Sequence, residues 1–131
     1  MSEFWRKVDK TLRYYSRQTT IALRGIWWDA HPVKASRPVF VIGCSRAGTT
    51  LVYKTLSESR ELGTLQRETH DFWSDLHPLQ TRQWKTHALD VSDASDQDRD
   101  TVNRYFYAWT GKRRFVDKNN QNGLCVAYLH S

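Results

Sequence analysis

The sequence is poor in cysteine and contains no long hydrophobic run. Its 131 residues include two cysteines, Cys44 and Cys125, which form no CxxC pair and exclude a disulfide scaffold, although one disulfide stays open. The longest weakly polar stretches, 21–28 and 38–44, are far shorter than the roughly 20 apolar residues that a membrane-spanning helix needs. The N-terminus lacks the apolar segment of a secretory signal. We therefore expect a cytoplasmic protein, since cysteine usage fits a reducing compartment.

The sequence is rich in aromatic residues and in positive charge. Aromatics make up 13% of the chain, with six tryptophans, which is too much for a disordered protein. The 20 Lys and Arg against 14 Asp and Glu give a net charge of +6, which suits an anionic partner. We do not expect nucleic acid to be that partner, because no known binding module accompanies the basic residues Arg99, Arg104, Lys112, Arg113 and Arg114.

Residues 1–36 are predicted to form a basic amphipathic helix and a linker. Apolar residues recur every three or four positions over 3–28, while most Lys and Arg lie off that stripe. Two interpretations stay open. The helix lies on an anionic membrane surface as a peripheral contact, or its stripe covers the domain that follows.

Residues 37–131 are predicted to form an α/β domain with a P-loop-type parallel sheet flanked by helices. The run 38–43 is short, apolar and largely β-branched, which is typical of a strand buried on both faces. A glycine-containing loop and a helix follow it, and this order opens an α/β fold. Further along we expect a strand at 62–65, a helical turn at 69–76, an irregular stretch at 77–95, a helix at 96–109, a strand at 113–118 and a helix at 121–129.

The loop after the first strand is nearly the P-loop pattern GxxxxGK[ST]. Gly43 and Gly48 occupy the glycine positions, Thr50 the hydroxyl position, and Thr49 stands where the phosphate-binding lysine is expected. Arg46 is the one cation inside the loop. Backbone N–H groups of such a loop surround a phosphate, and the helix N-terminus adds positive potential. A plain strand-to-helix turn is the alternative.

Residues 38–51 resemble the 5′-phosphosulfate-binding loop of sulfotransferases, which use 3′-phosphoadenosine 5′-phosphosulfate (PAPS). The likeness is to the branch with the loop Pro-Arg-Ser-Gly-Thr-Thr, which includes tyrosylprotein sulfotransferases and many bacterial members, although Ser45 replaces the proline and Ala47 the serine. Weaker likenesses follow in the family's order at 57–62, at 68–69 and at 115–119, the last similar to the family's Asp-Lys motif. The resemblance covers roughly 37–129 and implies the N-terminal half of a sulfotransferase domain, with an incomplete sheet.

The resemblance also implies site residues. The donor is bound by the loop residues Ser45, Arg46, Ala47, Gly48, Thr49 and Thr50. Arg46 and Lys118 stabilise the sulfuryl group and the leaving oxygens, without a metal. Glu68 matches the family's general base, and His70 is its rival because imidazole titrates near neutrality. The acceptor, a carbohydrate, lipid or peptide hydroxyl, cannot be read from the sequence.

Several alternatives compete with these roles. Asp117 ends an apolar strand and could hold Mg²⁺ in a P-loop kinase. Lys118 could be a solvated lysine at a helix start, and His77 and His87 are expected to be surface histidines without a role. The chain could also be a non-catalytic fragment or binding module, since the family's 3′-phosphate contacts follow the Asp-Lys motif and are not found here.

Overall fold

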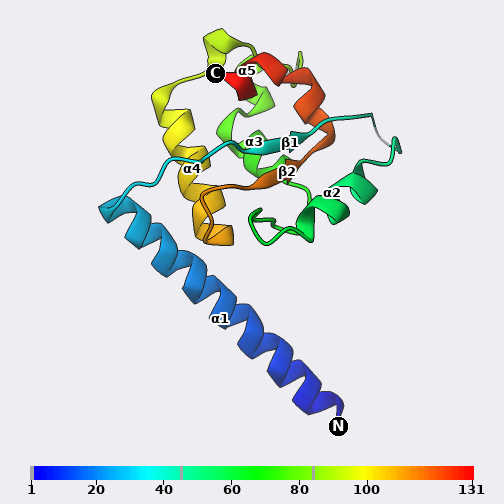
Figure 1. Ribbon diagram of the computed structural model, residues 1–131, viewed down its shortest axis with the longest axis vertical. Helices are drawn as coiled ribbons and strands as arrows, with labels where there is room; N and C mark the ends of the chain where they lie inside the picture. Colours follow the sequence, from blue (N-terminus) through cyan, green and yellow to red (C-terminus); the bar gives the residue numbers. More distant parts are fainter. Residues whose placement is uncertain (1, 45, 84) are drawn as a thin grey trace.

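The structure is mixed α/β and mostly helical (Figure 1). It is a computed structural model that describes residues 2–44, 46–83 and 85–131. Helices, 3-10 helices (η) and strands follow one another as α1 (Glu3–Ala30), β1 (Val39–Val41), α2 (Thr49–Ser57), α3 (His70–Leu76), η1 (Leu79–Arg82), η2 (Val91–Asp93), α4 (Asp96–Thr110), β2 (Val116–Lys118), η3 (Asn120–Leu124) and α5 (Val126–His130). The long helix α1 projects from the body, and the other helices surround the two strands.

The two strands pair in parallel, which confirms the prediction of a parallel sheet within a mixed α/β fold. Val39 lies opposite Val116, and both strands end at the same edge of the sheet. A third pass of the chain meets the other side of β2, where Gly63 forms a single parallel bridge with Phe115. The predicted strand at 62–65 is therefore reduced to one bridge.

Alternate residues of the sheet face two different layers of helices. Phe40 and Phe115 belong to a hydrophobic cluster with residues of α3, α4 and α5, while Val41 and Val116 pack against α2 in a second cluster. Phe106 of α4 is fully buried and stacks on Phe115 with 3.8 Å between the ring centroids. Because side chains along a strand alternate between its faces, consecutive residues of β2 reach different layers.

Several elements differ from the sequence prediction. The strand expected at 113–118 is reduced to β2, and the stretch 77–95, expected to be irregular, contains η1 and η2. The strand expected at 38–43 is shorter and is not buried along its whole length, because Ile42 has already left the sheet and is half exposed. The extended run near Gly63 stops where Gln66 adopts a left-handed conformation with φ 58°. The helix expected at 121–129 is divided at Cys125, whose backbone is not helical, into η3 and α5.

Helix α1 confirms the predicted N-terminal helix. It buries Gly25 and Trp28 and packs against α4. Arg104 of α4 holds the carboxylate of Asp29 with two hydrogen bonds of 2.8 and 3.0 Å, and these bonds lower the pKa of Asp29. Among the described residues, no helix combines the length and the apolar character that crossing a bilayer requires.

Candidate functional site

A cavity of about 370 Å³ lies where β2 ends, between α2 and the segment that leads into α3. Its walls are formed by Thr50, Tyr53, Lys54, Ser57, Gln66, Arg67, Glu68 and Lys118. Three residues that the sequence singles out, namely Thr50, Glu68 and Lys118, therefore lie around one cavity although they are distant along the chain. The cavity is at the carboxyl end of the strands, where open α/β sheets bind their ligands.

Lys118 and Glu68 form an ion pair in the wall of this cavity. The side chain of Lys118 is 9% exposed and that of Glu68 is 39% exposed. Lys118 is the last residue of β2 and lies on the same face as Val116, the face that α2 covers. The interpretation of Lys118 as a solvated lysine at a helix start is therefore wrong, because strand burial and Glu68 enclose its ammonium group.

Hydrogen bonds on both sides of Glu68 fix its place beside the cavity. On one side, the hydroxyl of Tyr53 in α2 accepts a hydrogen bond of 2.9 Å from the backbone N–H of Gln66. On the other side, the hydroxyl of Thr69 donates a hydrogen bond of 2.5 Å to the carboxylate of Asp117 in β2. The segment that carries Glu68 is thus anchored to both elements that form the cavity.

Asp117 lies on the opposite face of the sheet from Lys118. It is buried, and its carboxylate accepts hydrogen bonds of 3.1 Å from Trp73 Nε1 and Asn122 Nδ2 as well as the bond from Thr69. Burial raises the pKa of Asp117, although these donors act against the shift. Since the carboxylate is enclosed by protein donors and faces away from the cavity, the arrangement does not favour Asp117 as a magnesium ligand for a kinase.

The loop between β1 and α2 needs glycine at two positions, for different reasons. A Cβ atom on Gly43 would lie 2.6 Å from Cγ2 of Thr49, so the glycine allows Thr49 to pack against the loop. Gly48 precedes α2 with φ 86°, a left-handed conformation that favours glycine. Thr49, at the P-loop lysine position, is consequently buried and contributes to packing.

The backbone N–H groups at the start of α2 differ in their availability. The N–H of Ala47 donates to the carbonyl of Cys44 at 3.1 Å and is therefore already paired. Within the described part of the chain, the N–H groups of Thr49 and Thr50 have no acceptor, as is usual in the first turn of a helix. Ser45, which was predicted to contact the donor, lies outside the described residues.

Two predicted catalytic residues are not brought into the cavity wall. Arg46 is exposed, has a left-handed φ of 67° and is not among the described residues that line the cavity. His70 begins α3, with Nδ1 at 3.9 Å from the carboxylate of Glu68 and Nε2 at 3.2 Å from that of Asp71. His70 therefore touches the candidate base without lining the cavity.

Two further cations that the sequence prediction missed line the cavity. Lys54 lies on α2, and Arg67 immediately precedes Glu68. The guanidinium of Arg67 lies over the ring of Trp109, 4.8 Å from its centroid, which holds it in place. Together with Lys118 they make three basic residues and one acidic residue in the cavity wall, although the Arg67 guanidinium itself is held by Trp109 and by the hydroxyl of Tyr105. The excess of basic residues favours an anionic ligand.

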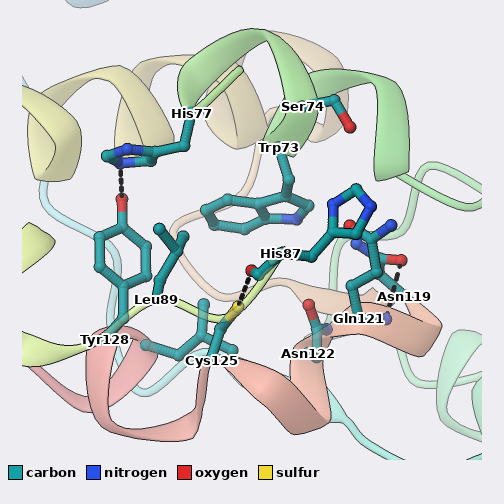
Figure 2. A pocket seen from close by; sticks show the side chains of 11 residues that line it. Trp73, Ser74, His77, His87, Leu89, Asn119, Gln121, Asn122, Cys125 and Tyr128 are labelled. Atoms are coloured by element: carbon teal, nitrogen blue, oxygen red, sulfur yellow. Dashed lines mark hydrogen bonds between the residues drawn. The ribbon is translucent and has the colours of Figure 1, made fainter. Parts of the chain in front are cut away.

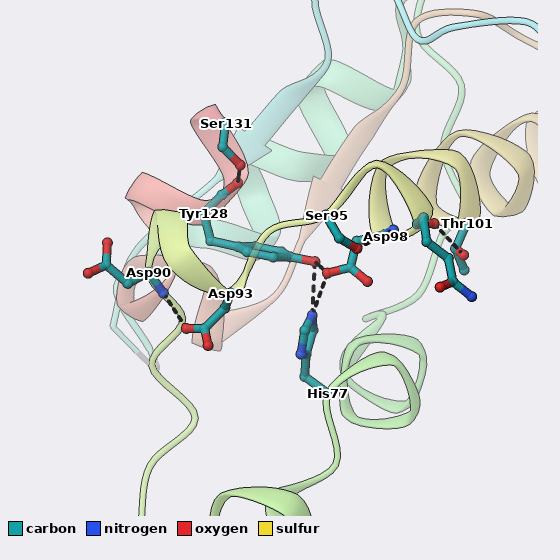
Figure 3. Close-up of polar contacts among 9 residues, drawn as sticks. His77, Asp90, Asp93, Ser95, Asp98, Thr101, Tyr128 and Ser131 are labelled. Atoms are coloured by element: carbon teal, nitrogen blue, oxygen red, sulfur yellow. Dashed lines mark hydrogen bonds and ion pairs between the residues drawn. The ribbon is translucent and has the colours of Figure 1, made fainter.

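His77 belongs to a polar cluster and is half-buried, so the prediction that it is a surface histidine is wrong. Its Nε2 lies 2.8 Å from the carboxylate of Asp98 and 3.2 Å from the hydroxyl of Tyr128 (Figure 3). The Tyr128 hydroxyl also donates to Asp98 at 2.9 Å. Burial, together with the hydrogen bond to Asp98, raises the pKa of Tyr128. The cluster joins the end of α3 to α4 and α5.

A second cavity lies beside Tyr128 and is lined by residues of α3, η3 and α5 (Figure 2). Its volume of about 20 Å³ leaves room for a single water molecule. His87 lines it, and the backbone carbonyl of His87 accepts a hydrogen bond of 3.4 Å from Sγ of Cys125. This region therefore serves packing and is too small to bind a substrate.

Several basic residues considered for nucleic-acid binding are engaged within the protein. The pairs are Arg99 with Asp96, Arg104 with Asp29, and Lys112 with the backbone carbonyl of Arg60. Because these cations already have partners, they do not form a free basic surface.

Comparison of the chain with protein-family models, with curated proteins and with solved structures gives no match. The chemistry of the site is therefore argued from its own residues. A nearly buried ammonium, an adjacent carboxylate and the start of a helix meet at a cationic cavity, and this combination can bind an anion and accept a proton beside it.

Proposed function

We propose that this chain acts in sulfuryl transfer from PAPS to a hydroxyl or amine acceptor. The observation that carries the proposal is the meeting of Lys118 and Glu68 at the cavity where α2 begins. The resemblance to sulfotransferases assigns a leaving-group cation, a general base and a donor-binding loop to these three places. In this proposal β1, β2 and α2 are the start of a P-loop-type sheet.

The charge around the cavity supports an anionic donor. Lys54, Arg67 and Lys118 surround a space that the first turn of α2 also adjoins. Free N–H groups and the helix dipole at such a turn favour phosphate and sulfate oxygens. Arg46 is exposed in the preceding loop and can approach the same anion from outside.

The transfer itself needs few groups. A bond forms between the acceptor oxygen or nitrogen and the sulfur atom, while the bond between sulfur and the bridging phosphate oxygen breaks. The proton of the acceptor passes to the carboxylate of Glu68, and Lys118 stabilises the negative charge on the departing phosphate oxygen. The products are the sulfated acceptor and 3′-phosphoadenosine 5′-phosphate.

The resting ion pair gives Lys118 and Glu68 a second role. An unpaired ammonium that is so little exposed would be costly, and Glu68 supplies its counter-charge. When the donor binds, its phosphate takes over the ammonium and leaves the carboxylate available to the acceptor.

Calorimetric titration of the full chain with 3′-phosphoadenosine 5′-phosphate tests the proposal. We expect metal-independent binding that Lys118→Met weakens about 10- to 100-fold, the range for loss of a charge-assisted hydrogen bond. Arg46→Ala should also weaken it. Lys10→Met is the matched control, because it makes the same change on the exposed helix α1.

Two results would count against sulfuryl transfer. Magnesium-dependent preference for ATP over 3′-phosphoadenosine 5′-phosphate would favour a kinase. Equal nucleotide affinity in Lys118→Met and Lys10→Met would show that the nucleotide does not bind at this cavity.

A further inference from the structure

Helix α1 carries an apolar stripe that the body does not cover. The stripe consists of Phe4, Leu12, Tyr15, Leu23 and Ile26, and each of these side chains is between 61% and 66% exposed. These residues recur every three to eight positions, so they share one side of the helix along nearly its whole length. The interpretation in which the stripe covers the following domain is therefore wrong.

The body is held by a different side of the helix. The residues of α1 that are buried or half-buried near α4 are Ile21, Arg24, Gly25 and Trp28. At 3.6 residues per turn, these positions lie about half a turn around the helix from the stripe. The stripe therefore faces away from the body, and α1 extends well beyond it (Figure 1).

Cations lie on the side of α1 opposite the stripe, and aromatic rings border it. The first part of α1 carries Arg6, Lys7, Lys10 and Arg13 against Glu3 and Asp9, while the guanidinium of Arg17 lies over the ring of Trp109 in α4. The two acids are paired within the helix, Glu3 with Lys7 and Asp9 with Arg13. Exposed Trp5 and Trp27 lie beside the stripe and add rings with one apolar and one polar side. The helix thus combines an apolar side with excess positive charge.

We propose that α1 docks on an anionic lipid surface, with the stripe in the interface and the body on the water side. A helix that has a basic polar side and an apolar side with aromatic residues, but is too polar as a whole to cross a bilayer, lies in the plane of such an interface. Charge complementarity selects this partner over a second copy of the chain. A second copy of α1 would carry the same excess of positive charge, whereas acidic headgroups neutralise it.

Sedimentation with phospholipid vesicles tests this docking. The full chain should bind vesicles of phosphatidylcholine with about 30% phosphatidylserine, bind pure phosphatidylcholine far more weakly, and lose affinity as salt rises because the headgroup attraction is screened. Leu12→Glu should weaken binding at least about tenfold more than Thr20→Glu, since Leu12 lies in the stripe and Thr20 lies off it. Both positions are exposed on α1, and both substitutions add one negative charge. Circular dichroism checks that both variants keep the helix.

Equal losses in the two variants, or binding that ignores phosphatidylserine, would overturn the proposal. Sedimentation equilibrium without vesicles tests whether the stripe instead binds a second copy of the chain. A dimer that Leu12→Glu dissociates and Thr20→Glu does not would assign the stripe to a second copy and also overturn it. None of these results depends on sulfuryl transfer.

Discussion

The carboxylate of Glu68 holds the ammonium of Lys118 at the end of β2, so the chain's most enclosed lysine has its counter-ion in the segment before α3. The pair lies in the wall of the cavity at the end of this strand. The two side chains differ in exposure as a transfer reaction would require. The ammonium of Lys118 is nearly buried, where it can stabilise a leaving group, and the carboxylate of Glu68 is partly open to an acceptor.

The identity of the general base can be tested with two substitutions by glutamine. Glu68→Gln should abolish measurable sulfuryl transfer, because the amide cannot take the acceptor proton. Binding of 3′-phosphoadenosine 5′-phosphate should be retained or become tighter in this variant, since Lys118 loses its competing carboxylate. His70→Gln should keep most activity, because His70 does not line the cavity. Activity is measured with radiolabelled PAPS and affinity by calorimetry.

The opposite pattern, with activity lost in His70→Gln and kept in Glu68→Gln, would make the histidine the base. Weaker nucleotide binding in Glu68→Gln would show instead that the carboxylate mainly keeps Lys118 in position.

The two loop glycines should respond differently to alanine. Gly48→Ala should lower the free energy of unfolding by about 1–2 kcal/mol, because φ 86° is unfavourable for a residue with a Cβ atom. Gly43→Ala should cost about 1–3 kcal/mol through overlap with the methyl group of Thr49. Urea unfolding measures both.

A second substitution distinguishes the two causes. Thr49→Ser removes the overlapping methyl group, so Gly43→Ala should cost less in the Thr49→Ser background than alone. Gly48→Ala should be unaffected by it. Gly123→Ala is the matched control, because no atom lies within 4 Å of the added Cβ, and it should change stability by no more than about 0.5 kcal/mol.

The buried carboxylate of Asp117 should make stability depend on pH. Because burial raises the pKa of folded Asp117 above the unfolded value of about 3.9, folding takes up a proton between those two values. The free energy of unfolding should therefore fall as pH rises through this window, by about 1.4 kcal/mol for each unit of elevation. Urea unfolding between about pH 4 and 8 measures this slope.

Asp117→Asn should remove that part of the slope, since an amide does not titrate. It should also be less stable at every pH, because its NH₂ group would face the donors of Trp73 or Asn122. A slope unchanged by the substitution would assign the pH dependence to other groups.

The hydroxyl of Tyr128 should contribute to holding α5 against α4. Tyr128→Phe removes the donor to Asp98 and should lower the free energy of unfolding by about 1–2 kcal/mol. Tyr14→Phe, on exposed α1, is the matched control and should be neutral. A loss of stability of equal size in both variants would show that the hydrogen bond to Asp98 is not its cause. Thermal and urea unfolding measure the difference.

Local pattern was enough to predict part of the fold from the sequence. The apolar run before Gly43 and the periodic apolar residues of α1 and α4 predict the elements that the structure contains, because each signal lies within one element. Gly63 forms a single bridge, to Phe115, and lies where a Cβ atom would overlap with Thr110 of α4. The sequence could not show this close approach, because it is made by a distant helix.

The candidate site was predictable only in part, for the same reason. Lys118 and Glu68 were singled out through a family resemblance, but the burial of Lys118 depends on how β2 packs against α2. Lys54 could have been found, because it follows Thr50 by one helical turn on the same side of α2. Arg67 carries no such signal, since its place depends on Trp109 of another helix.

Parallel pairing of Val39 with Val116 also affects synthesis of the chain. A ribosome releases β1 long before it makes β2, and no hairpin can form between them in the meantime. The glycine loop and α2 therefore remain without a paired sheet until β2 has emerged. Translation speed and chaperone access during that interval become determinants of yield for this protein.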